Sequence, residues 1–369
     1  MGLIRTILAL AVVIFHSAPF LGFRGIGGVI AVEAFYVISG FYMALILTER
    51  YVGPNRIKAF YASRALRLYP IYFIVLGLTI ALSIIWESRG LGNPLRVWFA
   101  TAGHLDPITL FVLILSNLTF IGQDVLCFLN VGPKGSFDFY MNIKPEMKGS
   151  WYLIINQSWT LGLEITFYLL APFLMRARTL MIVGLALWSF SLRNMAFEAG
   201  YDFDPWRYRF FPFELVFFLL GVLAYRAYVQ FDRCVRALSS PRVEQAIVLL
   251  GWTAVSALLA YAVIFADLHG QLSTVRFVIW LTLALPLVFF ATRSNRFDTA
   301  IGELSYPIYM CHFAFILFFP KSIEAFGFGY GETVAVLSIG FSMLLLWATR
   351  GIERYRHSFR ISFAKGATN

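Results

Sequence analysis

Long apolar runs alternate with short polar and basic segments along the whole chain. A helix needs roughly 20 mostly apolar residues to cross a bilayer, and it satisfies its backbone hydrogen bonds internally. We expect spans at residues 3–21, 28–48, 69–87, 152–175, 180–197, 211–230, 244–265, 275–292, 301–319 and 332–350. The pattern therefore predicts an all-α polytopic integral membrane protein with about ten transmembrane helices.

The charges between these runs predict the orientation of the chain. Lys and Arg are concentrated in residues 49–67, 176–178, 225–242, 293–296 and 350–365. Basic loops stay in the cytoplasm, and placing all of these there lets ten spans alternate consistently with both termini cytoplasmic. One more apolar segment, 107–131, would break this alternation if it crossed the membrane. We expect it to be re-entrant or to lie along the outer interface.

Composition agrees with a membrane protein and narrows its partners. The chain is 59% hydrophobic and only 14% charged, which is unlike a soluble domain. Its net charge of +10 lies between the spans, with no basic, aromatic-rich soluble segment for nucleic acid, so we expect a bilayer and no nucleic acid as partners. Cys127, Cys234 and Cys311 are isolated, so we expect no structural metal and no disulfide framework.

Five ionisable residues lie inside the predicted spans. An ionisable side chain at a helix centre costs roughly 2.5–3.5 kcal/mol on insertion scales, so such residues usually face a cavity or a partner. The five are His16, Glu33, Glu164, Glu214 and His312.

His16 and Glu33 occupy similar depths in the first helical hairpin. His16 lies eight residues before Arg24 in the turn, and Glu33 lies nine residues after it. A carboxylate that accepts from one imidazole nitrogen leaves the other nitrogen free as a base. The spacing fits equally a pair that only locks the hairpin. Glu164, twelve residues before Arg176, falls in the same layer and is the second candidate partner of the imidazole.

Arg64 and Arg67 form a second group. Their i, i+3 spacing places both on one helix face, and Pro70 is expected to mark the start of the third span. Two guanidiniums on one face suit phosphate oxygens. Basic residues at a cytoplasmic helix end are also ordinary topology anchors, and this interpretation is stronger for the nearby Lys58.

Three further residues are candidates for a substrate path. Trp159 stands at the start of a span, where tryptophan commonly serves as an interfacial anchor. His312 lies inside the ninth span with Tyr309 close by on the same helix. A histidine in this setting is either a hydrogen-bonded core residue or part of a pore lining.

Five features together resemble a known family. They are His16 in the first span and the segments GGVIAVEAFYVISGFYM (27–43), RALRLYPIY (64–72), SWTLGLEITFYLLAPFL (158–174) and IGELSYPIYMCHF (301–313). In this order they resemble the membrane acyltransferase-3 family, bacterial inner-membrane enzymes that O-acylate extracytoplasmic glycans. Two positions depart from the family pattern, because Thr160 stands where Ser is usual and Glu33 where Asp is typical.

The resemblance implies roles for these residues. His16 corresponds to the proposed catalytic residue, and Arg64 and Arg67 correspond to a pair thought to contact the acyl-CoA donor, with Lys58 as a further candidate contact. It also implies a membrane acyltransferase domain over residues 1–352, a short basic cytoplasmic tail over 353–369, and a place in the bacterial inner membrane.

The resemblance implies acyl transfer across the membrane. Acetyl-CoA would enter from the cytoplasm, and a hydroxyl of a polysaccharide, an oligosaccharide or a lipid-linked sugar would accept the acyl group outside. His16 would act as general base or carry the acyl group, with Glu33 or Glu164 orienting it. The alternative is a secondary transporter with intramembrane His and Glu coupling residues. A transporter typically contains an inverted repeat, and none is evident in this sequence.

Overall fold

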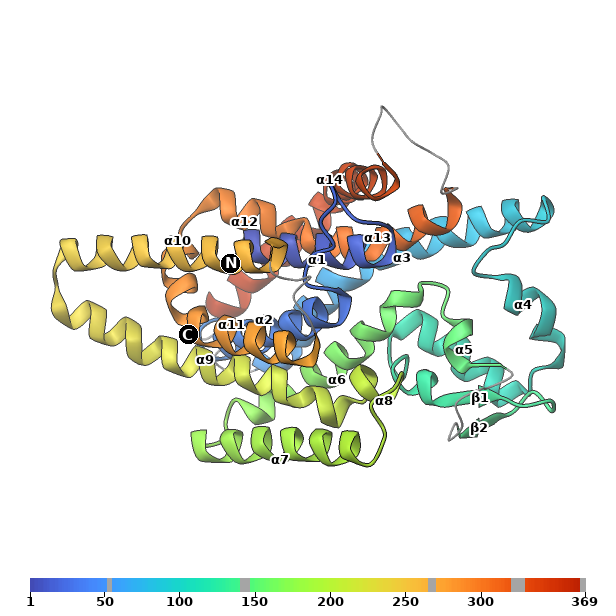
Figure 1. The fold of residues 1–369 in the computed structure, drawn as a ribbon, viewed down its shortest axis with the longest axis horizontal. Helices are drawn as coiled ribbons and strands as arrows, with labels where there is room; N and C mark the ends of the chain where they lie inside the picture. Colours follow the sequence, from blue (N-terminus) through green and yellow to red (C-terminus); the bar gives the residue numbers. More distant parts are fainter. Residues whose placement is uncertain (52–54, 140–146, 265–269, 320–328, 366–369) are drawn as a thin grey trace.

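A computed structural model describes residues 1–51, 55–139, 147–264, 270–319 and 329–365 (Figure 1). The last four residues of the predicted cytoplasmic tail, 366–369, lie outside the described residues. The α-helices are α1 (Gly2–His16), α2 (Gly28–Glu49), α3 (Arg56–Ser88), α4 (Arg96–Thr101), α5 (Pro107–Thr119), α6 (Trp159–Leu174), α7 (Thr179–Glu198), α8 (Trp206–Arg209), α9 (Phe211–Leu238), α10 (Pro241–Ile264), α11 (Gly270–Thr292), α12 (Arg296–Glu303), α13 (Ser305–Phe318) and α14 (Tyr330–Lys365). Short 3₁₀ helices are η1 (Ala102–His104), η2 (Val125–Phe128), η3 (Gly149–Tyr152) and η4 (Asn156–Ser158), and strand β1 (Leu129–Val131) pairs antiparallel with β2 (Phe137–Phe139).

The helices fit a polytopic membrane protein. Among the described residues, eight segments are long and apolar enough to cross a bilayer, namely Gly28–Glu49, Arg56–Ser88, Thr179–Glu198, Trp206–Leu238, Pro241–Val263, Val275–Thr292, Arg296–Phe318 and Tyr330–Arg356. Every predicted span contains a helix, but α1 and α6 have only 15 and 16 residues. The all-α membrane architecture is therefore confirmed. The count of ten crossings and the cytoplasmic position of both termini stay predictions.

Helix α3 starts earlier than predicted. It runs unbroken for 33 residues from Arg56, so Pro70 lies inside it and does not mark the start of a span. At about 1.5 Å per residue the helix is roughly 50 Å long, well beyond the roughly 30 Å thickness of a hydrocarbon core. Arg64 and Arg67 consequently belong to the same rigid rod as the membrane-spanning part.

The segment 107–131 does not form one continuous helix. Asp106 caps α5 by accepting from the backbone N–H of Ile108 at 3.0 Å and of Thr109 at 3.2 Å. The helix ends after 13 residues, where Phe120 adopts a left-handed conformation with φ 64°. Thirteen residues span only about 20 Å, too short for a full crossing by this helix. Its re-entrant or interfacial position stays a prediction.

The centre of the bundle is the crossing of α2 and α9. A Cβ atom added to Gly40 would lie 1.9 Å from the carbonyl oxygen of Phe218, and one added to Gly221 would lie 1.9 Å from that of Val37. The two backbones therefore touch where each helix has no side chain, as is common between membrane helices. Tyr36 stacks on Phe218 beside this contact, with ring centroids 4.6 Å apart.

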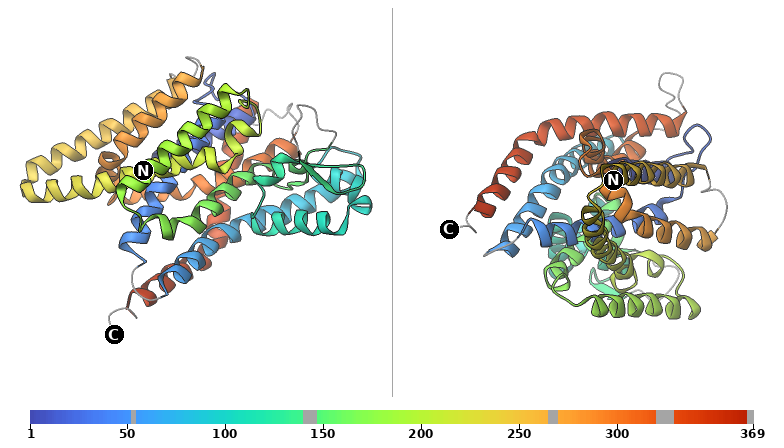
Figure 2. Two further views of the ribbon diagram at one scale, coloured as in Figure 1. Left: turned by 90° about the horizontal axis from the view of Figure 1, so that it is seen from below. Right: turned by 90° about the vertical axis from the view of Figure 1, so that its left-hand side faces the viewer.

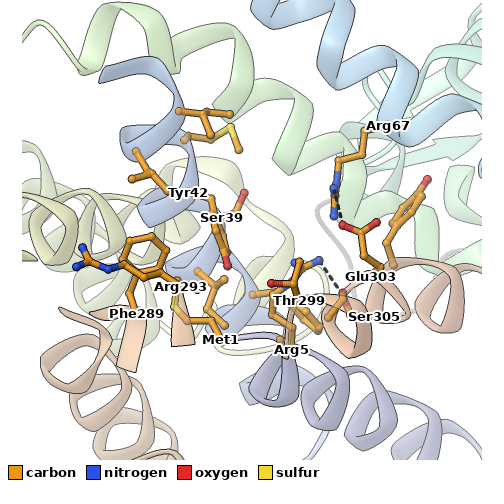
Figure 3. Close-up of a pocket in the computed structure, with 18 of the residues that line it drawn as sticks. Met1, Arg5, Ser39, Tyr42, Arg67, Phe289, Arg293, Thr299, Glu303 and Ser305 are labelled. Atoms are coloured by element: carbon orange, nitrogen blue, oxygen red, sulfur yellow. Dashed lines mark hydrogen bonds and ion pairs between the residues drawn. The ribbon is translucent and has the colours of Figure 1, made fainter. Parts of the chain in front are cut away.

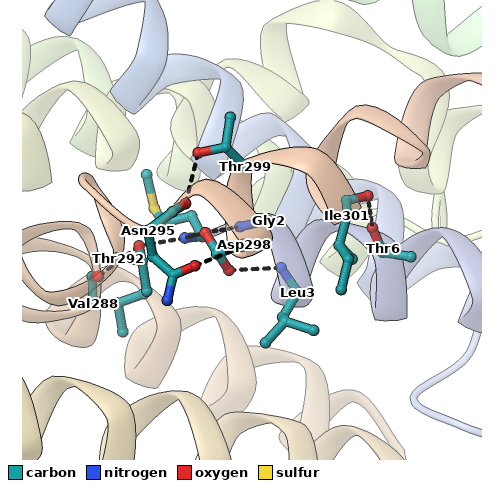
Figure 4. Close-up of polar contacts among 10 residues, drawn as sticks. Gly2, Leu3, Thr6, Val288, Thr292, Asn295, Asp298, Thr299 and Ile301 are labelled. Carbon is teal, nitrogen blue, oxygen red and sulfur yellow. Dashed lines mark hydrogen bonds and ion pairs between the residues drawn. The ribbon is translucent and has the colours of Figure 1, made fainter. Parts of the chain in front are cut away.

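Helix α1 is held at its first turn by α12 (Figure 4). The Asp298 carboxylate accepts from the backbone N–H of Gly2 at 2.7 Å and of Leu3 at 2.9 Å. The backbone N–H of Asp298 donates in turn to the side-chain oxygen of Asn295 at 2.9 Å. A carboxylate at a helix N-terminus satisfies free N–H groups and suits the helix dipole. Thr6 also donates to the carbonyl oxygen of Ile301 at 2.7 Å. These contacts fix the axial position of α1, and with it the height of His16 at its other end.

The two ends of the bundle differ. Helices α4 and α5 and the β1–β2 hairpin gather at one end, while the turn between α9 and α10 projects from the other (Figure 1). Helix α14 runs beside α3 in both views of Figure 2, and the two helices are in contact. In the predicted topology, the α9–α10 turn is at the cytoplasmic end and the β hairpin at the outer end.

Candidate active site

A cavity of about 830 Å³ opens among α1, α2, α3, α6, α9 and the α11–α13 segment (Figure 3). This volume lies within the range usual for small-molecule and cofactor sites. Eight arginines line it, namely Arg5, Arg50, Arg64, Arg67, Arg233, Arg236, Arg293 and Arg356. Its acidic lining residues are Glu49, Glu164, Asp232, Asp298 and Glu303. The arginines outnumber the acidic groups, so the cavity suits an anion.

Both members of the predicted arginine pair face this cavity. Arg67 points toward Glu303 across it, with 4.0 Å between Nη1 and Oε1 (Figure 3). Arg64 Nε is buried and has no hydrogen-bond partner among the described residues. Lys58, the third predicted donor contact, is exposed and does not line the cavity. The i, i+3 spacing thus identified two residues that line the cavity. Lys58 is close to them in sequence but does not line it.

Glu164 belongs to the same cavity. Ser39 and Tyr168 lie within hydrogen-bonding reach of its carboxylate, and Arg64 is a nearby cation. His16 does not line this cavity. Glu164 was predicted at the same depth as His16, but its carboxylate does not contact the imidazole. It lies in the cavity with the guanidinium groups.

His16 is the last residue of α1 and contacts His312. The two rings are 5.4 Å apart and inclined by 26°, and His16 Nδ1 lies 3.3 Å from His312 Nε2. His16 is exposed, whereas His312 is fully buried. Phe313 packs edge-on against His16, with ring centroids 5.0 Å apart. This places an imidazole at the surface with a second imidazole behind it, an arrangement able to take a proton from an approaching hydroxyl group.

Tyr309 belongs both to the cavity and to the surroundings of the two histidines. Its side chain lines the cavity, and its hydroxyl group is hydrogen-bonded to Thr160 Oγ1 at 2.8 Å. Its backbone carbonyl oxygen lies 2.8 Å from His312 Nδ1 and also accepts from Gln157 Nε2 at 3.2 Å. One residue therefore borders the basic cavity with its side chain and the histidine pair with its backbone.

Comparison with known proteins identifies the family. The family described as an acyltransferase domain, acyltransferase-3, matches residues 1–349, nearly the whole chain. The chain belongs to this family. It is also similar to the exopolysaccharide production protein ExoZ of Rhizobium meliloti (strain 1021), with 28% identity over 155 residues. That match covers 42% of this chain and 37% of the relative. No solved structure shows significant similarity to this chain.

The predicted pairing of Glu33 with His16 is wrong. Glu33 is fully buried and accepts from Arg193 Nη2 at 2.6 Å, while Arg193 Nη1 donates to Glu214 at 3.0 Å. The three side chains connect α2, α7 and α9. The hairpin spacing gave the depth of Glu33 but not the face of α2 on which it lies. That face is turned toward α7 and α9, so the carboxylate meets a guanidinium there.

The remaining predicted contact, Trp159, is the first residue of α6 and does not line the cavity. It is 8% exposed, and the Arg209 guanidinium carbon lies 4.4 Å from its ring centroid. Arg209 is bound in turn by Asp204, with 3.2 Å between Nη2 and Oδ2. Among the described residues, no group of three or more His, Cys, Asp or Glu side chains is arranged to hold a metal ion.

Sequence reasoning missed several residues of the site. Arg5 lines the cavity and donates to Ser305 at 2.8 Å, and Gln157 donates to the carbonyl oxygens of Tyr309 and Met310. Arg193 was missed although it stands inside a predicted span. The available signal was its charge, because an arginine within a span needs a carboxylate partner as much as a glutamate needs a cation.

Proposed function

We propose that this acyltransferase transfers an acyl group from cytoplasmic acyl-CoA to a hydroxyl group of a carbohydrate outside the membrane. One observation carries the proposal. Tyr309 lines the arginine-lined cavity, and its backbone carbonyl oxygen contacts His312, whose ring lies behind the exposed His16. The anion site and the histidine pair therefore have Tyr309 in common.

The donor site is the basic cavity. Coenzyme A carries several phosphate charges, and guanidinium groups bind phosphate oxygens with charge-assisted hydrogen bonds. Arg64 and Arg67 are the proposed phosphate contacts, with the Glu303 carboxylate 4.0 Å from the Arg67 guanidinium. Acetyl-CoA is the donor that we propose, in keeping with the family. Helix α1 joins the two sites, because Arg5 lines the cavity and His16 follows eleven residues, or roughly 16 Å, later.

The chemistry needs a base for a weak nucleophile. His16 accepts the proton of the acceptor hydroxyl group while the hydroxyl oxygen attacks the thioester carbonyl carbon. The carbon–sulfur bond breaks, the coenzyme A thiolate leaves and takes up the proton, and an ester is formed. A covalent acyl-imidazole on His16 is the second route that the same geometry allows.

The relative named for exopolysaccharide production supports a carbohydrate acceptor. The alignment covers only 42% of this chain and 37% of the relative. A carbohydrate acceptor is therefore part of the proposal. We propose a polysaccharide, an oligosaccharide or a lipid-linked sugar, with the enzyme in the bacterial cytoplasmic membrane. The exposed position of His16 at the predicted outer end agrees with an acceptor that approaches from outside.

The proposal is tested with bacterial membrane vesicles that contain the full chain and labelled acetyl-CoA. His16→Ala is expected to reduce label in the carbohydrate fraction to background without changing acetyl-CoA affinity. His104→Ala, at an exposed histidine of η1, is the matched control. Transfer at the wild-type rate by folded His16→Ala protein would contradict the catalytic role.

The donor site is tested separately by binding of acetyl-CoA to purified protein. A hydrogen bond to a charged group contributes about 1.5–3 kcal/mol, so Arg64→Met together with Arg67→Met should weaken binding by at least about tenfold. Arg176→Met with Arg178→Met removes two exposed cations from the α6–α7 turn and serves as control. Equal affinities of the two double variants would favour the topology-anchor interpretation of the pair.

A further inference from the structure

We propose that His312 is a positioning residue that fixes the tautomer of His16 and so leaves His16 Nε2 as the reactive nitrogen. The inference rests on the proposed function only in taking His16 as the base. It is carried by two contacts on opposite sides of one buried ring. His312 Nδ1 lies 2.8 Å from the carbonyl oxygen of Tyr309, and His312 Nε2 lies 3.3 Å from His16 Nδ1.

The direction of these hydrogen bonds follows from the chemistry of the groups. A carbonyl oxygen only accepts, so His312 Nδ1 must carry the proton in its contact with Tyr309. A neutral imidazole carries one proton, and His312 Nε2 is therefore an acceptor. The contact at 3.3 Å then requires that His16 Nδ1 donates. His16 Nε2 is left with an unshared electron pair, in the state that a general base needs.

The carbonyl group that starts this chain of hydrogen bonds is itself held firmly. Gln157 from η4 donates to the carbonyl oxygens of both Tyr309 and Met310, at 3.2 and 2.8 Å. His312 is fully buried in α13, so water does not compete for its nitrogens. The His312 ring both donates and accepts, and hydrogen bonds linked in such a chain polarise one another. The direction of donation is therefore set by the protein backbone.

This arrangement replaces the acidic partner that an imidazole base commonly has. In a hydrolase triad a carboxylate holds the tautomer and stabilises the imidazolium. Here a neutral imidazole performs the first task, and Glu33 is committed to Arg193. When His16 takes a proton on Nε2, its Nδ1–H group becomes a charge-assisted donor to His312 Nε2. The proton on His312 Nδ1 stays in place throughout the step.

Two substitutions of His312 separate its acceptor from its donor. The side-chain oxygen of glutamine reaches the position of Nε2, so His312→Gln keeps an acceptor for His16 Nδ1–H. Asparagine ends near the position of Nδ1, so His312→Asn keeps the donor to the Tyr309 carbonyl group and loses the acceptor. We expect His312→Asn to lower the transfer rate by about 100-fold and His312→Gln to restore most of it, with unchanged acetyl-CoA affinity in both.

The tautomer is read directly from ¹⁵N NMR spectra of protein labelled at its five histidines. His16 is assigned by comparison with His16→Ala, and a protonated Nδ1 with an unprotonated Nε2 is expected in the wild type. A protonated Nε2 in the wild type would overturn the inference, as would equal rates of folded His312→Asn and His312→Gln. The proposed function fails by a different result, transfer by His16→Ala, so the two failures are distinguishable.

Discussion

The ion-pair cluster of Glu33, Arg193 and Glu214 yields a sharp prediction, because it decides between a structural and a catalytic role for Glu33. Arg193 is the cation between Glu33 and Glu214, and both carboxylates are fully buried. Their second oxygens, Glu33 Oε2 and Glu214 Oε2, have no hydrogen-bond partner among the described residues. Arg193→Met therefore leaves two buried carboxylates without the cation that they share.

The magnitude follows from this loss of compensation. Removing one partner of a buried ion pair typically costs about 3–5 kcal/mol. Arg193 also lies over the rings of Phe217 and Phe197, with its guanidinium carbon 4.9 and 5.2 Å from the centroids, and methionine keeps part of that packing. We expect the apparent melting temperature of the purified protein to fall by an amount on the order of 10 °C.

The assay is thermal unfolding in detergent, followed by size-exclusion chromatography. Arg178→Met is the matched control, because Arg178 is exposed at the start of the same helix. Glu33→Gln should cost far less than Arg193→Met, since the amide oxygen still accepts and the Arg193–Glu214 pair persists. It should also retain acyl transfer. Wild-type melting of Arg193→Met, or loss of transfer by Glu33→Gln at unchanged melting temperature, would refute the reasoning.

Three other changes are predicted to affect folding. Gly40→Ala should sharply reduce the yield of folded protein, because its Cβ would lie 1.9 Å from an α9 carbonyl oxygen, whereas Gly77→Ala on α3, with no atom within 4 Å of its Cβ, should be tolerated. Asp298→Ala should cost roughly 1 kcal/mol or more in thermal unfolding, because the first turn of α1 loses its acceptor, and an unchanged melting temperature would contradict this. Burial raises the pKa of Asp124 in the segment before η2 to about 6, so its contribution to stability is lost as pH rises through 6. Asp124→Asn should therefore raise the melting temperature more at pH 7.5 than at pH 4.5, and the reverse order would contradict the sign.

The all-α membrane architecture and the arginine pair followed from the sequence. Runs of apolar residues determine which segments cross a membrane, because the bilayer acts on each helix separately. The period of the helix likewise places Arg64 and Arg67 on one face whatever surrounds them. The family motifs, in their order along the chain, were sufficient to assign the chain to its family.

Only the tertiary structure decided which intramembrane charges meet. The spacing in a hairpin gives the depth of Glu33, but the rotation of α2 about its axis is set by its contact with α9 at Gly40 and Gly221. That rotation turns Glu33 toward Arg193. The partner of His16 is His312, which lies 296 residues away in the sequence. Helices in a membrane gain little from burying apolar surface against one another, so small residues and polar contacts select their packing. Those contacts join segments distant in sequence, and no local pattern encodes them.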